Sequence, residues 1–155
     1  MKRLLLTILL LCGSALATTR YVAQSAGTFS GGTACNGQTA VAAPYTVTSA
    51  SATVYVCGTI SSSTAGAGPK ITVGSSGSGT SGSPTEIIFD TGASITNSAY
   101  WSSSSSGGAI NLAGASWVIV DGGTPCGWNV ATNTSEGTCN GYIQNTGNGD
   151  SLTYQ

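Results

Sequence analysis

The amino-acid sequence predicts an all-β solenoid, in which short strands stack as successive coils. Two copies of one pattern carry this prediction. Each copy is an apolar run that ends in an aspartate and a glycine turn, at 86–90 and at 117–121, and each follows an earlier short strand, at 71–73 and at 110–112. Repeated short strands punctuated by glycine turns are typical of solenoids. A β-sandwich, which needs no such stacking register, is the alternative fold.

The first 17 residues are expected to be a secretory signal peptide. Lys2 and Arg3 form a basic start, residues 4–11 are apolar, and 15–17 (ALA) give a small-x-small cleavage site. The apolar run is too short for a membrane span, which needs about 20 residues. A lipoprotein signal at Cys12 is the lesser alternative, because Leu11 is large where a small residue is wanted. We therefore expect an exported domain, 18–155.

The charge of this domain excludes two classes of partner. Without Lys2 and Arg3, only Arg20 and Lys70 remain basic against five acidic residues, which gives a formal charge of −3. A nucleic-acid surface needs a basic patch, and an acidic membrane surface needs basic residues too. Only 6% of residues are charged, and Val, Ile and Thr recur in strand-length runs. This pattern favours a folded, turn-rich β protein over a disordered chain.

The expected elements follow in chain order. Residues 18–24 form a strand and 25–40 a loop around Cys35, and further strands follow at 45–48, 53–57, 71–73, 86–89, 110–112, 117–120 and 142–145. The segments between them, including 61–69, 74–85, 96–109 and 113–116, are rich in Gly and Ser and are expected to be turns of variable length. No segment after the signal peptide has helical periodicity.

Aligning the two copies on Asp90 and Asp121 predicts which side chains face inward. This alignment places Ile87 on Val118 and Phe89 on Val120. These four residues are expected in the interior, because side chains alternate between the two faces of a strand. The outward positions are then Ile88, Ile119 and Trp117.

Four cysteines follow the signal peptide, which suggests disulfides in an exported chain. Three pairings are possible. The preferred one joins Cys35 to Cys57 and Cys126 to Cys139, because each bond closes a local loop. A zinc site is disfavoured by the absence of histidine and of any closely spaced cysteine pair.

Several stretches together carry a family resemblance: 21–25 (YVAQS), 53–59 (TVYVCGT), 79–89 (GTSGSPTEIIF) and 116–123 (SWVIVDGG). They resemble the N-terminal coils of secreted right-handed parallel β-helix proteins of the pectate-lyase-like superfamily. The likeness covers most of residues 20–150. It implies a polysaccharide-acting protein whose coils continue beyond Gln155. The short capping helix usual in that superfamily has no counterpart in 36–52.

No catalytic motif of that superfamily matches this chain. Its lyases use acidic calcium ligands and a base, and its hydrolases use clustered aspartates, but neither Arg20 nor Lys70 lies in a matching context. The one candidate constellation is Asp90 with Asp121, which stacking would bring about 5 Å apart. Such a pair could share Ca²⁺. The favoured interpretation is that each aspartate accepts hydrogen bonds in its own glycine turn, so no catalytic, cofactor or metal residue is assigned.

Aromatic residues could stack on sugar rings or cover the edges of the core. The two roles are balanced for Trp117, and the covering role is favoured for Trp101, Trp128, Tyr100 and Tyr142. Asn133 begins a glycan-acceptor pattern. Two functions follow: a scaffold within a polysaccharide-cleaving enzyme, or a non-catalytic surface module that binds glycans. In either case this segment alone is expected to cleave nothing.

Overall fold

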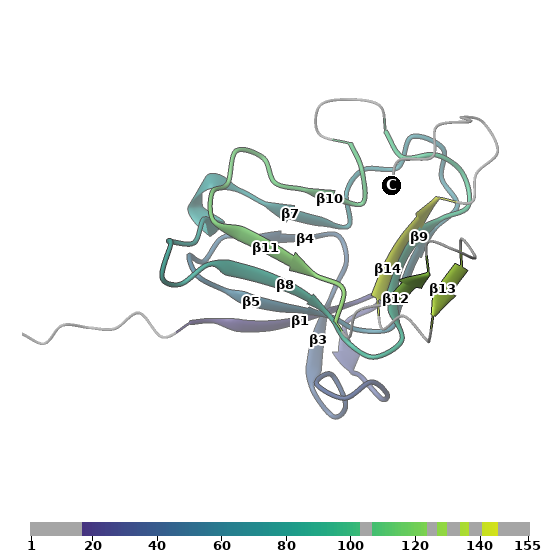
Figure 1. Ribbon diagram of the computed structural model, residues 1–155, viewed down its shortest axis with the longest axis horizontal. Helices are drawn as coiled ribbons and strands as arrows, with labels where there is room; N and C mark the ends of the chain where they lie inside the picture. The colour runs from purple at the N-terminus through teal and green to yellow at the C-terminus, as the bar shows by residue number, and fades with distance from the viewer. Residues whose placement is uncertain (1–16, 103–106, 124–126, 130–133, 137–140, 146–155) are drawn as a thin grey trace, which may run out of the picture.

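The computed structural model describes residues 17–102, 107–123, 127–129, 134–136 and 141–145, and these ranges are all-β, with no α-helix (Figure 1). A six-stranded sheet has the order β11-β8-β5-β1-β3-β2, and two three-stranded sheets have the orders β10-β7-β4 and β14-β9-β6. The strands are β1 (Thr19–Ala23), β2 (Gly27–Thr28), β3 (Thr39–Ala42), β4 (Tyr45–Val47), β5 (Thr53–Val56), β6 (Thr59–Ser62), β7 (Ile71–Val73), β8 (Thr85–Phe89), β9 (Ala93–Asn97), β10 (Ile110–Asn111), β11 (Val118–Asp121), β12 (Gly127–Asn129), β13 (Thr134–Glu136) and β14 (Gly141–Asn145).

The chain visits the three sheets in a repeating order. It passes from β5 to β6 to β7, and then from β8 to β9 to β10, so that each strand pairs in parallel with the strand one pass earlier. The next pass supplies β11 and β14, again in parallel pairing. The predicted all-β class is confirmed, and the parallel sheets are consistent with a β-solenoid-like fold. The β-sandwich alternative, whose sheets are antiparallel, does not fit these registers.

All three sheets contribute side chains to one hydrophobic core. The six-stranded sheet supplies Val54, Val56, Ile87 and Phe89, the β6–β9–β14 sheet supplies Ile60 and Ile95, and the β4–β7–β10 sheet supplies Val47, Ile71 and Val73. Every one of these side chains is almost completely buried. Three short sheets can therefore share a core that no single sheet could form with its own inner face.

The register between β8 and β11 differs from the predicted one. Val120 lies opposite Ile87, and Val118 lies opposite Thr85, so the predicted alignment was wrong by two residues. The predicted inward and outward faces are still correct, because a shift of two residues returns each side chain to the same side of a strand. Ile87 and Phe89 are buried as predicted, and the outward-facing Ile119 and Trp117 are exposed. Val118 packs against the core, but Val120 remains 46% exposed because no described strand lies beyond β11.

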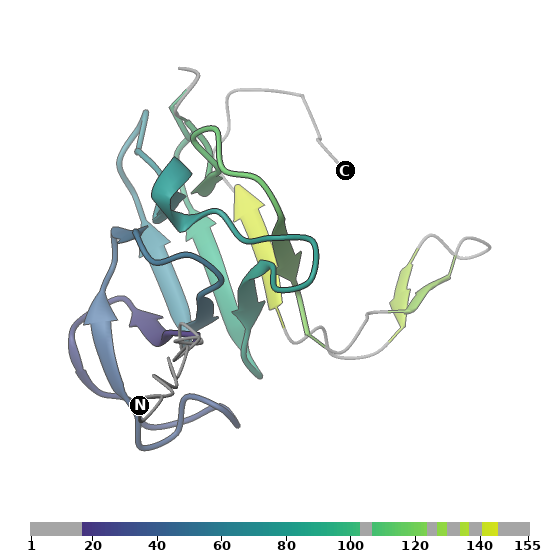
Figure 2. The ribbon, with the colours of Figure 1, turned by 90° about the vertical axis from the view of Figure 1, so that its left-hand side faces the viewer.

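The predicted strands recur in the structure, but six further strands were not predicted: β2, β3, β6, β9, β12 and β13. Among them, β6 runs into the turn expected at 61–69 and β9 ends inside the one expected at 96–109, and these two strands pair in the β6–β9–β14 sheet. The antiparallel pairs are short: β2 with β3, and β12 with β13, a hairpin that stands apart from the three sheets in Figure 2. In the described part of the chain, no helix has the length and apolar character to cross a membrane. Residues 1–16 of the predicted signal peptide lie outside the described residues, as do both cysteines of the predicted bond between Cys126 and Cys139.

Candidate functional site

The β6–β9–β14 sheet carries an open groove of about 620 Å³ on its surface. A volume in this range suits a small organic ligand or part of a polymer. Hydroxyl and amide side chains dominate the lining, with one phenol. The lining residues are Gln24, Thr59, Ser61, Ser62, Ser63, Thr96, Ser98, Tyr142 and Gln144.

The polar side chains form two rows that cross the strands. Alternate residues of each strand point outward, while Ile60 and Ile95 between them enter the core. The parallel registers then bring outward residues of neighbouring strands side by side. The rows are Thr59, Ser94, Tyr142 and Ser61, Thr96, Gln144. In each row the hydroxyl residues of β6 and β9 are therefore one strand spacing apart, about 4.8 Å, and the β14 residue follows at the same spacing.

Buried polar residues fix the shape of this sheet. The Ser94 hydroxyl is buried and donates to the Thr59 hydroxyl across the strands, at 3.1 Å. Asn97 is completely buried at the end of β9. Its side-chain amide donates to the carbonyl oxygens of Thr64 and Tyr100, and its oxygen accepts from the backbone N–H of Ala99. Asn97 thus ties together the two loops that leave β6 and β9 at one end of the groove.

Gln24 closes the other side of the groove. β6 is an edge strand of its sheet, and its Ser61 N–H donates to the Gln24 Oε1 at 2.7 Å. A side chain here satisfies a backbone donor that a further strand would otherwise take. Because Gln24 directly follows β1, the first pass of the chain supplies one wall of the groove.

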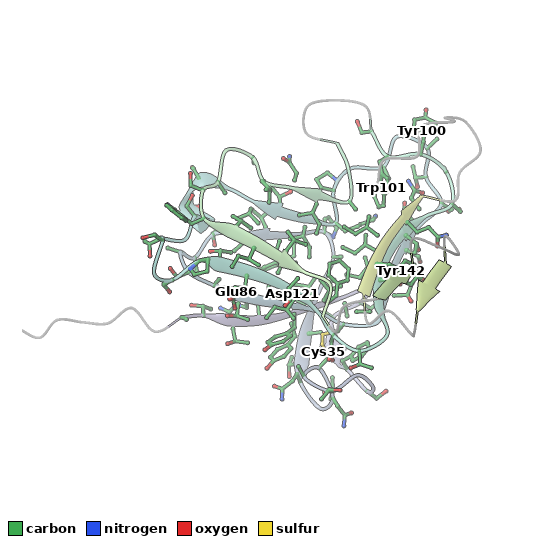
Figure 3. The ribbon with its side chains drawn as sticks, in the orientation of Figure 1. Cys35, Glu86, Tyr100, Trp101, Asp121 and Tyr142 are labelled. Atoms are coloured by element: carbon green, nitrogen blue, oxygen red, sulfur yellow. A yellow bond between two sulfur atoms is a disulfide. The ribbon has the colours of Figure 1, made fainter. Side chains whose placement is uncertain are left out.

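Of the aromatic residues singled out in the sequence whose side chains the structure describes, Tyr142 alone lines the groove. Tyr142 is 48% exposed on β14, where it continues the row that begins at Thr59. Tyr100 is equally exposed but lies on the loop after β9, and Trp101 packs against the core. Tyr142 lies on β14, whereas Glu86 and Asp121 lie on β8 and β11 of the six-stranded sheet (Figure 3). Tyr142 was expected to cover an edge of the core, and the structure places it in the lining of the groove.

Trp117 does not line the groove. Trp117 is 59% exposed immediately before β11, a strand of the six-stranded sheet. Trp128 lies in β12, but its side chain is outside the described part of the structure, as is Asn133 of the glycan-acceptor pattern.

Asp90 forms a separate polar site at the end of β8. Its carboxylate accepts hydrogen bonds from the backbone N–H groups of Thr33, Ala34 and Cys35, at 2.8–3.1 Å. Burial of the carboxyl acts to raise the pKa of Asp90, but the N–H groups of Cys35, Ala34, Thr91 and Thr33 outweigh it, and the pKa is lowered. The same loop is joined to the end of β5 by the predicted disulfide between Cys35 and Cys57, which is confirmed.

The two aspartates do not form a pair. Asp121 lies opposite Ile88 in the register, two positions before Asp90, so the predicted equivalence of Asp90 and Asp121 was wrong. Asp121 accepts a hydrogen bond from the N–H of Gly123 in its own turn, as expected for an aspartate before glycine. Asp90 accepts from the N–H of Thr91 in its own turn and also from a loop 55 to 57 residues earlier in the chain. Among the described residues, no three acidic or cysteine side chains gather as metal ligands would.

Asp90→Asn is expected to lower the free energy of unfolding by about 2 kcal/mol at neutral pH, since hydrogen bonds to a charged acceptor are stronger than those to an amide. Because the folded-state pKa is lowered, the carboxylate stabilises the fold above its ordinary pKa of about 3.9, and this contribution disappears as the pH falls through the folded-state pKa. Urea unfolding of both proteins at neutral and acidic pH measures the difference. A difference that vanished in chelator at neutral pH would instead indicate a calcium ligand.

The groove could not have been found from any motif in the sequence. Of its three strands only β14 was predicted, and only parallel pairing brings Thr59, Thr96 and Gln144 to one surface. The weak signal was Ser or Thr on both sides of a single isoleucine, at 59–61 and at 94–96. Comparison with protein-family models, with curated proteins and with solved structures finds no match for this chain.

Proposed function

We propose that this chain is an exported module of the right-handed parallel β-helix type that binds a polysaccharide in the groove of the β6–β9–β14 sheet without cleaving it. The chemistry of the lining carries the proposal. Hydroxyl and amide groups both donate and accept hydrogen bonds, as sugar hydroxyls do, and Tyr142 offers an exposed ring for a sugar face. A scaffold within an enzyme does not need a groove lined by hydroxyl, amide and aromatic groups, whereas a glycan-binding module does.

The lining also favours binding over catalysis. Cleavage of a glycosidic bond requires a positioned acid and a base or nucleophile. None of the nine lining residues is a carboxylate, an imidazole or an amine. The acidic residues with described side chains lie elsewhere: Glu86 and Asp121 belong to the six-stranded sheet, and Asp90 is engaged by the 33–35 loop. We therefore expect no release of reducing or unsaturated ends from polysaccharides, measured against heat-treated protein.

Tyr142→Ala is expected to weaken oligosaccharide binding about tenfold, the effect of losing roughly 1.4 kcal/mol of ring stacking. Tyr100→Ala is the matched control, because Tyr100 has almost the same exposure but does not line the groove. Isothermal titration of both variants with a panel of oligosaccharides tests the proposal. Equal losses in the two variants, or binding that neither variant changes, would place the glycan site elsewhere.

A further inference from the structure

The groove has no charge of its own, and the cations of the domain lie outside it. After the signal peptide only Arg20 and Lys70 are basic. Arg20 belongs to β1 of the six-stranded sheet, and Lys70 directly precedes β7 of the β4–β7–β10 sheet. Neither residue lines the groove. A bound ligand would therefore meet only neutral donors and acceptors there.

This distribution bears on which polysaccharides can bind. An anionic chain, such as a uronate polymer, would bring a carboxylate on most of its sugars into the groove. Moving an ion out of water is costly unless a partner charge replaces its hydration. Recognition of carboxylates in proteins normally uses Arg or Lys, often in bidentate geometry, and no such side chain lines this site.

A neutral sugar chain makes the opposite demand. Each sugar hydroxyl is both a donor and an acceptor, and it can pair with a Ser or Thr hydroxyl in either sense. The row of Ser61, Thr96 and Gln144 offers such groups on all three strands of the sheet. Tyr142 lies beside Gln144 on β14 and can stack on an apolar sugar face.

We propose that the groove selects uncharged polysaccharides and rejects uronate polymers, and that calcium takes no part in binding. This inference rests on the proposed glycan-binding function. It differs from a uronate specificity, which would require cations or bound calcium in the groove. The uncharged side chains that line the groove determine this selectivity, and Tyr142 supplies the stacking surface.

Titration of the purified chain with two sets of oligosaccharides tests the selectivity. The neutral set contains cello-, xylo-, manno- and malto-oligosaccharides, and the anionic set contains oligogalacturonates and oligoalginates. We expect heat of binding with at least one neutral ligand and with none of the anionic set. We expect affinity to be the same at low and high sodium chloride, because no charge pair contributes to it, and the same with or without a chelator.

Gln144→Lys provides a gain-of-function arm. Gln144 is exposed, so a lysine there is compatible with the fold. We expect this variant to acquire affinity for oligogalacturonate at low salt and to lose that affinity at high salt. Ser81→Lys is the control, because it adds the same charge at an exposed turn residue outside the groove. Equal gains in the two variants would show that net charge alone attracts the uronate, and would overturn the assignment to the groove.

The outcomes separate the selectivity from the function on which it rests. Binding of uronates that Tyr142→Ala weakens, with Tyr100→Ala unchanged, would overturn the neutral selectivity but leave glycan binding in the groove. Affinity that depended on calcium would overturn the inference in the same way. Failure of every ligand in both sets would overturn the inference and the proposed function together.

Discussion

Phe89→Ala is expected to lower the free energy of unfolding by about 3–5 kcal/mol, the range for truncation of a buried aromatic side chain. Phe89 is 3% exposed and lies in the core that all three sheets share. Its register partner Val56 is buried beside it. Phe89 also packs directly against Gly141 at the start of β14, where a Cβ would overlap the Phe89 side chain. Loss of the ring would therefore open a cavity between β5, β8 and the start of β14.

Ile88→Ala is the matched control for Phe89→Ala. Ile88 is the neighbouring residue of the same strand, but it faces outward and is only partly buried. Its truncation removes less apolar contact and leaves no enclosed cavity, so it should cost clearly less. Urea denaturation of both variants, with equal slopes, measures the difference. If Ile88→Ala proved as damaging as Phe89→Ala, the assignment of inner and outer faces in β8 would be refuted.

Removing the Cys35–Cys57 bond by a double alanine substitution is expected to cost about 3 kcal/mol by the loop-entropy model. The bond spans 22 residues, and both cysteines are almost completely buried. Non-reducing peptide mapping checks the connectivity, and urea unfolding checks the energy. Free thiols at Cys35 and Cys57 in exported protein, or a link from Cys57 to Cys126, would contradict the expected bond.

The disulfide and the Asp90 carboxylate should not act independently. Cys35 contributes its sulfur to the disulfide and its backbone N–H to Asp90, at 2.8 Å. The disulfide therefore keeps the Cys35 N–H in position for Asp90, and the hydrogen bond to Asp90 keeps the Cys35 sulfur in position for the disulfide. A double-mutant cycle of the cysteine pair with Asp90→Asn should give a coupling free energy of about 0.5–3 kcal/mol, the range for residues in direct contact. Strict additivity would show that the loop keeps its position after either attachment is lost.

The fold could be predicted from the sequence where strands carried consecutive apolar residues. β5, β8 and β11 were predicted for this reason. β6 and β9 were not, because each has one buried isoleucine between hydroxyl residues, a pattern that also occurs in turns. The register failed for a different reason. Asp90 follows β8 whereas Asp121 is the last residue of β11, so the two aspartates do not hold equivalent positions.

The candidate site was less predictable than the fold. No single strand contains the groove, and its residues become neighbours only through pairing over 35 to 48 sequence positions, as from Thr59 to Ser94 and on to Tyr142. The partners of Asp90 were equally unpredictable, because they are backbone N–H groups of a distant loop, and almost every residue type has a backbone N–H. The Gly turn beside Asp90 suggested local partners alone, whereas all but Thr91 of its N–H partners lie in the 33–35 loop.

The double attachment of the 33–35 loop predicts an order of assembly. The disulfide partner follows Cys35 by 22 residues, whereas Asp90 follows the loop by 55 to 57 residues. A chain that emerges from its N-terminus can form the first attachment once β5 has joined β1, but the second must wait for β8. Protection of the Cys35 amide from hydrogen exchange would therefore appear late. This protection would report when a nascent chain has completed the pass that contains Asp90.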